Sequence, residues 1–188
     1  RDLVRSRGLG DVYKRQGFEQ IRNSIGYPHL NVKIAATHAG ITVGEDGATH
    51  QCLEDIALMR VLPGMTVISP ADAVEAVAAL KAALEMTGPC YLRFGRYAVP
   101  VLHDPDTYRF EIGKGEVLRD GSDVTIVANG ILVSMALTAA DTLAAEGISA
   151  RVINIHTVKP LDTELLCAAA AETVSYTHLR AHETVLDL

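Results

Sequence analysis

Two histidines and an aspartate lie close together in one glycine-rich stretch, and their side chains are suited to binding and moving protons. His38, Asp46 and His50 all fall within residues 36–51. An imidazole titrates near neutral pH, so it can accept a hydroxyl proton or donate to an oxygen that develops negative charge. A carboxylate beside it can fix a hydroxyl group. The stretch therefore predicts a site for a polyhydroxylated or carbonyl substrate.

Other chemistries are compatible with these residues but are less favoured. Two imidazoles and a carboxylate could hold Zn²⁺, yet neither histidine stands in a recognised ligand spacing, so no metal ligand is assigned. No serine stands in a nucleophile elbow, and Glu45 with Asp46 would repel a phosphate. Structural roles also remain open: His38 could satisfy backbone groups, His50 could be a solvated helix residue, and Asp46 could form a turn.

A cation is expected beside this stretch. Residues 31–37 are short and apolar, which predicts a buried strand leading into the loop, and a second apolar run at 90–94 ends just before Arg96. If the two strands are parallel, their carboxyl ends meet at one edge of the sheet, so Arg96 emerges beside His38. A guanidinium there can hold a terminal phosphate of a substrate.

Apolar runs alternate with helical periods along the chain, which predicts an α/β fold of two units with mainly parallel sheets. The first unit spans 17–97, a linker without periodicity spans 98–112, and the second unit spans 113–173. The expected strands are 31–37, 65–68, 90–94, 113–119, 123–128 and 150–155, and the expected helices are 17–25, 50–61, 73–86, 130–146 and 161–171.

Local signals predict where some elements begin and turn. Thr49 is expected to cap the helix at 50–61, and Ser69 is expected to cap the helix at 73–86, with a proline at its first position. The dipeptide Asp120-Gly121 predicts a hairpin-type turn between the first two strands of the second unit.

Histidines outside the loop are weaker candidates. His103 lies in the linker and is expected to be solvated, whereas His156 follows a strand end in the second unit and could have a minor role in a site. His178 and His182 belong to a C-terminal tail that is not expected to take part in the fold.

Composition limits the classes of function. The 188 residues carry 17 Lys+Arg against 23 Asp+Glu, a formal net charge of −6, so nucleic acid is not an expected partner. No apolar run approaches the roughly 20 residues that span a bilayer, so no membrane partner is expected. The three scattered cysteines favour free thiols in a reducing compartment, and we expect a cytoplasmic protein.

Both ends of the chain differ in character from the units between them. Residues 1–16 carry five Lys/Arg and two Asp without a helical or strand period, and residues 174–188 are out of register with the helix before them. Both segments resemble translated sequencing-adapter sequence and are expected to be non-native tails. The part between them would then be a fragment of a longer protein.

Several short motifs together resemble transketolase. They are Thr37-His38, Gly44-Glu45-Asp46-Gly47-Ala48-Thr49-His50-Gln51, Leu62-Pro63-Gly64-Met65, Ser69-Pro70-Ala71-Asp72 and Arg93-Phe94-Gly95-Arg96. The likeness extends over most of the chain and is greatest to the separate C-terminal subunit of split bacterial and archaeal transketolases. It implies that the first unit is part of a thiamine-diphosphate-binding pyrimidine domain and that the second begins the transketolase C-terminal domain.

The resemblance also implies an activity and roles for the loop residues. Transketolases transfer a two-carbon ketol unit between sugar phosphates with thiamine diphosphate, as in the pentose phosphate pathway. By this resemblance, His38 contacts the donor sugar and its phosphate, Asp46 binds a substrate hydroxyl, and Arg96 holds the substrate phosphate. His50 is implied as the catalytic residue, close to the carbonyl carbon and to the amino group of the cofactor.

Partners are implied as well. The glutamate that activates the cofactor would lie upstream of the native segment, and the site for the diphosphate and for Mg²⁺ or Ca²⁺ would belong to an N-terminal transketolase subunit. We therefore expect a homodimer or a heterotetramer, sugar phosphates as substrates, and no turnover by this chain alone. Ala48 stands where the family motif has proline, which leaves the neighbouring aspartate and histidine in place.

Two other hypotheses remain open. The synthase that makes 1-deoxy-D-xylulose 5-phosphate has a similar loop segment and the same cofactor. A hypothesis of another class is a non-catalytic α/β assembly subunit, in which the loop packs on a partner without chemistry. Pyruvate dehydrogenase-type β subunits share the fold, but they are not expected to carry both His38 and His50.

Overall fold

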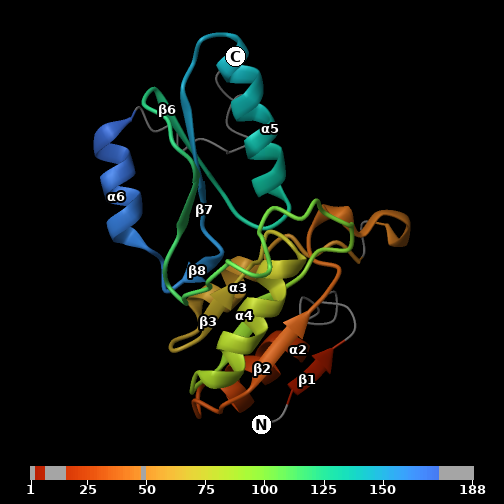
Figure 1. Ribbon diagram of the computed structural model, residues 1–188. Coiled ribbons are helices and arrows are strands. Elements are labelled where there is room, and N and C mark those ends of the chain that lie inside the picture. The colour runs from red at the N-terminus through yellow and green to blue at the C-terminus, as the bar shows by residue number, and fades with distance from the viewer. Residues whose placement is uncertain (1–2, 7–15, 48–49, 174–188) are drawn as a thin grey trace, which may run out of the picture.

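Two sheets with helices on their faces make up the described part of the chain (Figure 1). The computed structural model describes residues 3–6, 16–47 and 50–173. The strands are β1 (Leu3–Ser6), β2 (Lys33–Ala36), β3 (Thr66–Ile68), β4 (Cys90–Arg93), β5 (Glu116–Arg119), β6 (Val124–Ala128), β7 (Ala150–Asn154) and β8 (Thr157–Lys159). The helices are α2 (Gln16–Ile21), α3 (Asp55–Val61), α4 (Ala73–Glu85), α5 (Leu132–Ala145) and α6 (Thr163–Glu172), with a π-helical turn η1 (Arg22–Gly26) and a 3-10 segment η2 (Ile41–Asp46).

The strand order confirms an α/β fold with parallel-rich sheets. The first sheet has the order β1-β2-β4-β3-β8, in which only the β3–β8 pair is antiparallel. The second sheet has the order β5-β7-β6, in which β6 and β7 are parallel. No helix in the described ranges is long and apolar enough to cross a membrane.

Helices cover both faces of the first sheet. Since successive strand residues point to opposite faces, both sets of side chains are buried. Tyr91 of β4 packs in a cluster with Met59 of α3, whereas the next residue, Leu92, packs with Ala79 and Ala83 of α4. All of these side chains are fully buried. Strands buried on both faces read as continuous apolar runs, which is why the sequence predicted a buried strand at 31–37 and further strands at 65–68 and 90–94.

The second sheet repeats this arrangement. Val152 of β7 packs with Val133 of α5, and the next residue, Ile153, packs with Ala169 of α6. Figure 1 shows α5 and α6 on opposite sides of β6 and β7. Both helices were predicted from their apolar period, since packing of an amphipathic face supplies most of a helix's stability in a protein.

One strand of the second unit belongs to the first sheet and was not predicted. β8 runs antiparallel to β3, with Val67 opposite Lys159. The Lys159 ammonium donates to the carbonyl oxygens of Arg60 at 2.8 Å and Leu62 at 2.5 Å. Three residues are too few to show a period, so the sequence did not predict this strand. It forms because β3 offers a partner for pairing. It ties the second unit to the end of α3.

The predicted start of one helix and the predicted cap of another are wrong. α3 begins at Asp55 rather than at His50, because the preceding residues bond to the loop instead: the Cys52 carbonyl accepts from the Gly40 N–H at 3.0 Å. The expected cap, Thr49, lies outside the described residues. α4 is capped by Asp72, whose carboxylate accepts from a backbone N–H in the first turn of the helix at 2.8 Å. The Ser69 N–H is engaged elsewhere, with the second unit.

The hairpin predicted at Asp120-Gly121 is also wrong. β7 lies between the two strands that this turn connects, antiparallel to β5 and parallel to β6. The turn passes so close to β7 that a Cβ at Gly121 would lie 2.2 Å from the backbone of Ala150 and Arg151. Glycine is therefore required here by close backbone approach rather than by hairpin geometry.

A strand is present near the amino end of the chain, where no strand period was found. β1 pairs in parallel with β2, with Leu3 opposite Lys33 and Ser6 opposite Ala36. The expectation of an irregular segment is wrong for residues 3–6. The strand forms by pairing with the edge of β2, and its own sequence has no strand period. That residues 1–16 and 174–188 are non-native remains a prediction, and 174–188 lies outside the described residues.

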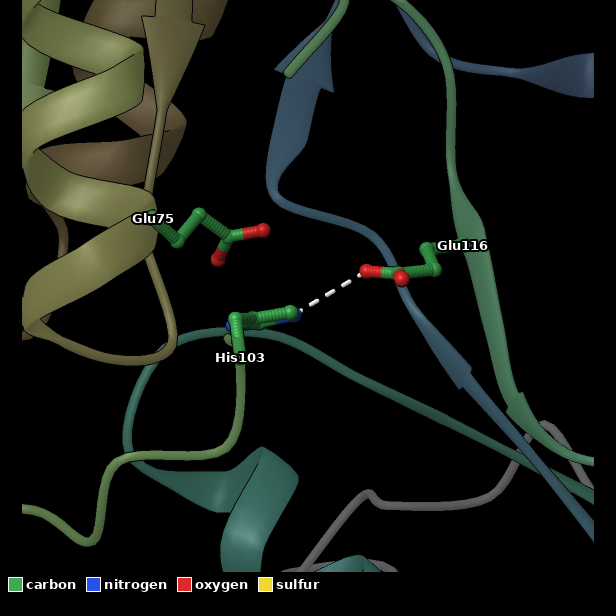
Figure 2. A group of neighbouring side chains, drawn as sticks. All are labelled: Glu75, His103 and Glu116. Atoms are coloured by element: carbon green, nitrogen blue, oxygen red, sulfur yellow. Dashed lines mark hydrogen bonds and ion pairs between the residues drawn. The ribbon is translucent and has the colours of Figure 1, made fainter. Parts of the chain in front are cut away.

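His103 connects the linker to both units, so the expectation of a solvated side chain is wrong. Its Nδ1 lies 3.0 Å from an Asp72 carboxylate oxygen at the start of α4, and its Nε2 lies 3.0 Å from a Glu116 carboxylate oxygen on β5. Figure 2 shows the ring pointing at Glu116, with Glu75 of α4 nearby. The residue is only 7% exposed. We call Asp72, His103 and Glu116 the linker clamp.

The linker clamp is held by charge. Burial lowers the pKa of His103, but the hydrogen bond to Glu116 and the charge of Asp72 outweigh burial and raise the pKa to about 9. Burial raises the pKa of Asp72, but hydrogen bonds from the Glu75, His103 and Leu102 backbone outweigh it and hold that pKa below its usual value. At neutral pH a charged imidazolium therefore bridges two carboxylates from different units.

Substitution of His103 by glutamine should reduce stability more at low pH than at high pH. The folded pKa of about 9 lies above the ordinary value of 6.5, so the stabilisation is complete below 6.5 and is lost as the pH rises through about 9. Urea unfolding midpoints of wild type and His103→Gln, measured at about pH 6 and about pH 9.5, should differ more at the lower pH. An equal difference at both would show that the ring is uncharged in the folded chain.

Candidate active site

The candidate site lies where β2 and β4 end side by side. The two strands are parallel, with Ala36 opposite Arg93. The pairing continues past the strands, because the Phe94 N–H donates to the Ala36 carbonyl at 2.8 Å and the Ala39 N–H donates to the Phe94 carbonyl at 3.2 Å. His38 and Arg96 thus follow adjacent strand ends, as the sequence predicted.

The site loop, by which we mean the described residues 37–47 and 50–52, folds back on itself. The Gly40 N–H donates to the Cys52 carbonyl at 3.0 Å, and the Gln51 side-chain amide donates to the Ile41 carbonyl at 3.3 Å. η2 begins directly after Gly40. These bonds bring together the two segments that carry the candidate histidines.

The two histidines of the site loop are exposed. His38 has a φ of 64°, which is unusual for a residue other than glycine, and its Nδ1 lies 3.0 Å from the Thr37 hydroxyl. Such a conformation is kept only where the surroundings impose it, and it often marks a functional position. His50 lies on the returning arm of the loop, where its N–H donates to the Gly47 carbonyl at 3.1 Å. The backbone of Asp46 ends η2, and its side chain lies outside the described part.

Arg96 contacts the site loop directly. Its Nη1 donates to the Val43 carbonyl within η2. Gly44, next in the chain, has a φ of 73°, and a Cβ there would lie 3.3 Å from the Tyr97 hydroxyl and 3.5 Å from Arg96 Nη1. A guanidinium has five N–H donors, so it can bind a carbonyl and a phosphate at the same time. The site loop and the end of β4 therefore form one surface.

A buried ion pair that sequence reasoning missed lies beneath this surface. The Arg93 Nε donates to Asp55 Oδ2 at 2.7 Å, and the Tyr91 hydroxyl donates to the same oxygen at 3.0 Å. Asp55 is fully buried and Arg93 is 19% exposed. The sequence did carry a signal: a charged residue closes an otherwise apolar strand, and buried charges are almost always paired.

One group of described residues could hold a metal, but its bonding argues against that role. Single ligand atoms of Glu75, His103 and Glu116 lie within 4.8 Å of one another. Glu75 already accepts from the Tyr108 hydroxyl at 2.5 Å, the Asn154 amide at 2.9 Å and a backbone N–H at 2.6 Å. Both ring nitrogens of His103 are also bonded. His103 and Glu116 belong to the linker clamp, and Glu75 lies beside them on α4.

His156 does not join the site loop in the described structure. It is buried at the junction of the units, its ring lies 4.3 Å from that of Phe110, and its Nδ1 lies 3.0 Å from the Thr157 hydroxyl. Burial lowers the pKa of His156 to about 4, so the ring is neutral at physiological pH. Its position indicates a packing role, and the minor site role considered for it is not supported.

Two domain families match the chain. Residues 15–101 match the family described as transketolase, pyrimidine binding domain, and residues 113–184 match the family described as transketolase, C-terminal domain. The two matches lie on either side of a short segment that contains His103.

Individual proteins are similar to the chain over most of its length. A protein of Methanocaldococcus jannaschii described as a transketolase C-terminal section is 47% identical over 152 residues, which are 80% of this chain and 48% of that protein. The 1-deoxy-D-xylulose-5-phosphate synthase of Heliobacterium modesticaldum is 42% identical over 163 residues, which are 86% of this chain and 25% of the synthase. The chain therefore spans half or less of the length of these relatives.

A solved structure has the same fold. It is described as a split gene transketolase, inactive beta4 tetramer, and is 50% identical in sequence with a TM-score of 0.81. The match covers 91% of this chain and 56% of that one.

Removal of the Asp55 carboxylate should destabilise the fold strongly. Asp55→Ala leaves the Arg93 guanidinium mostly buried without its partner, which we expect to cost about 3 kcal/mol of unfolding free energy. Asp141→Ala is the control, because Asp141 pairs with Arg119 on the exposed surface, where an ion pair contributes about 1 kcal/mol or less. Urea unfolding measures both, and equal losses would contradict the assignment of a buried pair.

Proposed function

The chain belongs to the transketolase family, and from that premise we propose that it forms the substrate side of a site that transfers a two-carbon ketol unit between sugar phosphates. The observation that carries the proposal is that His38 and Arg96 follow adjacent strand ends, beside a loop that returns to His50. These are the residue types that binding a phosphorylated polyol and moving its protons require.

Each loop residue has a proposed role. Arg96 binds the substrate phosphate with its fixed fork of donors, and His38 contacts the donor sugar and its phosphate. Asp46 accepts a hydrogen bond from a substrate hydroxyl and so selects its configuration. His50 donates a proton to, or accepts one from, the oxygen at the carbon that reacts, since an imidazole can do either near neutral pH. None of these roles needs a residue from outside the site loop and the end of β4.

The cofactor that we propose is thiamine diphosphate, which when bound supplies the carbon nucleophile that takes up the ketol unit. The exposed ring of His50 suits contact with a bound organic cofactor. In the metal-capable group described above, Glu75 and His103 are buried and already hydrogen-bonded, and Glu116 bonds the His103 ring, so the group does not suit a metal that binds a diphosphate. We therefore propose that an N-terminal subunit holds the diphosphate and its Mg²⁺ or Ca²⁺.

The assembly is part of the same proposal. Residues 17–97 would serve as a pyrimidine-binding domain, 98–112 as the linker and 113–173 as a C-terminal transketolase domain. The active unit would be a homodimer or a heterotetramer with the N-terminal subunit. The chain alone would not turn over substrate, because residues that activate the cofactor would come from outside it.

A second candidate is 1-deoxy-D-xylulose-5-phosphate synthase, favoured by the 42% identity to the enzyme of Heliobacterium modesticaldum. Both reactions add a two-carbon unit to a phosphorylated aldehyde, so the same arginine and histidines could serve either. A non-catalytic assembly subunit is the candidate of a different class.

A reconstitution assay separates these functions. Residues 17–173 replace the matching segment of a full-length split-type C-terminal subunit, which is mixed with its N-terminal partner, thiamine diphosphate and Mg²⁺. Ketol transfer from xylulose 5-phosphate to ribose 5-phosphate supports the proposal. Condensation of pyruvate with glyceraldehyde 3-phosphate instead supports the synthase, and a folded, assembled protein that is silent in both assays supports the assembly subunit.

In that assay His50→Ala should lower turnover by about 10² or more, as expected for loss of an acid–base group. His29→Ala is the control, because His29 is exposed before β2 and outside the site loop. Turnover is measured at saturating substrate. An unchanged rate in His50→Ala would exclude a catalytic role for this imidazole.

Arg96→Ala should raise KM for phosphorylated donors by about tenfold or more, since a charge-assisted hydrogen bond contributes about 1.5–3 kcal/mol. KM for an unphosphorylated donor such as hydroxypyruvate should change much less. Initial rates over a range of each donor give the comparison. Equal changes for the two donors would contradict the phosphate assignment.

A further inference from the structure

We propose that Arg93 is a positioning residue of the site: anchored by Asp55, its guanidinium holds Gly40 and so fixes the start of the site loop. The catalytic consequence of this inference rests on the proposed function, whereas its structural consequence does not.

The Arg93 side chain reaches from the first residue of α3 to the first turn of the site loop. At one end its Nε donates to Asp55 Oδ2 at 2.7 Å. At the other end its Nη2 lies 3.2 Å from the place that a Cβ would occupy at Gly40. One rigid, planar group thus lies between the helix and the loop.

The anchor at Asp55 is rigid. The carboxylate is fully buried, and its Oδ2 also accepts from the Tyr91 hydroxyl at 3.0 Å. Burial and the charge of Asp55 raise the pKa of Tyr91, so this hydroxyl keeps its proton and remains a donor. Asp55 Oδ1 is buried and has no hydrogen-bond partner among the described residues. The charge of Asp55 is therefore balanced mainly by Arg93, which holds the guanidinium in place.

Gly40 fits this guanidinium closely. Its φ of 82° is readily adopted by glycine, and any side chain would press on Arg93 Nη2. The N–H of Gly40 closes the loop by donating to the Cys52 carbonyl, and η2 begins at the next residue. A shift of Gly40 would therefore move η2 and both arms of the loop.

The end of β4 holds the site loop at two points. Arg93 lies against Gly40 at the start of η2, and Arg96 bonds to the Val43 carbonyl within η2. Lysine could keep the charge of Arg93, but a single ammonium cannot bond Asp55 and also lie against Gly40. Arg93→Lys therefore keeps the positive charge at this position but removes the simultaneous contact with Asp55 and Gly40.

Amide hydrogen exchange of the full chain tests the structural part. In Arg93→Lys the Gly40 N–H should exchange at least tenfold faster than in wild type, while the Phe94 N–H, bonded to Ala36, should keep its rate. The Phe94 amide reports general destabilisation, so a change confined to Gly40 is local. An unchanged Gly40 rate, or equal acceleration at both amides, would overturn the proposal.

Arg151→Lys is the matched control. Arg151 is 17% exposed, similar to Arg93, and it pairs with Glu172 at 2.7 Å on the second sheet. This variant should leave the exchange rates of Gly40 and Phe94 unchanged. If it accelerated Gly40 as much as Arg93→Lys does, the effect would come from losing any part-buried arginine and the proposal would fail.

The reconstituted enzyme tests the catalytic part. Arg93→Lys should raise KM for xylulose 5-phosphate by about tenfold and also lower kcat, because the displaced loop carries both the substrate contacts and His50. Faster exchange at Gly40 with unchanged KM would overturn the positioning role. If wild type shows no transfer, the proposed function fails, but the exchange measurement still tests whether Arg93 positions the loop.

Discussion

The parallel pairing of β2 with β4 is the constraint on which the rest of the site depends. Because the strands run in the same direction in register, with Lys33 opposite Cys90 and Ala36 opposite Arg93, they end at the same level. Everything that follows each strand then emerges at one edge of the sheet. The loop after β2 brings imidazoles to that edge, and the end of β4 brings guanidinium groups. In an antiparallel pair the imidazoles and the guanidinium groups would lie at opposite ends of the strands.

Two buried charged clusters stabilise different parts of this molecule. Under the site loop, Asp55 is balanced mainly by Arg93, and the pair supports a turn of the backbone. At the linker, His103 lies between Asp72 and Glu116, and its charge joins two units. The imidazolium can lose its proton as the pH rises through about 9, so the junction of the two units weakens at high pH.

The loop itself combines unusual backbone with firm attachment. Gly40 and Gly44 take positive φ values, and His38 does so without being a glycine. Glycine adopts such a conformation readily, whereas for His38 it is costly. The loop is held by the bond from Gly40 to Cys52 and by the bond from Arg96 to Val43. A loop built in this way holds its side chains in place before a substrate arrives, which lowers the entropic cost of binding.

Much of the architecture could be predicted from the sequence because its causes are local. Continuous apolar runs identified β2, β3 and β4, and the apolar period of α5 identified that helix. The placement of Arg96 beside His38 followed from one rule about parallel sheets. The predicted roles of the loop residues rest on motifs, which also act over short distances along the chain.

What only the tertiary structure decided depends on residues far apart in the sequence. His103 looked like a solvated linker residue because Asp72 and Glu116, the groups that bury it, lie 31 residues before it and 13 after it. The start of α3 moved to Asp55 because Cys52 bonds back to the loop, and β8 exists only because β3 offers it an edge. Periodicity reports how a segment folds against an apolar surface, but it does not identify the partner of a charge, a backbone carbonyl or a strand edge. Those partners are set by the approach of distant segments. The sequence by itself therefore determined most of the elements, and the tertiary structure alone decided the edge strands β1 and β8 and what holds the site loop in place.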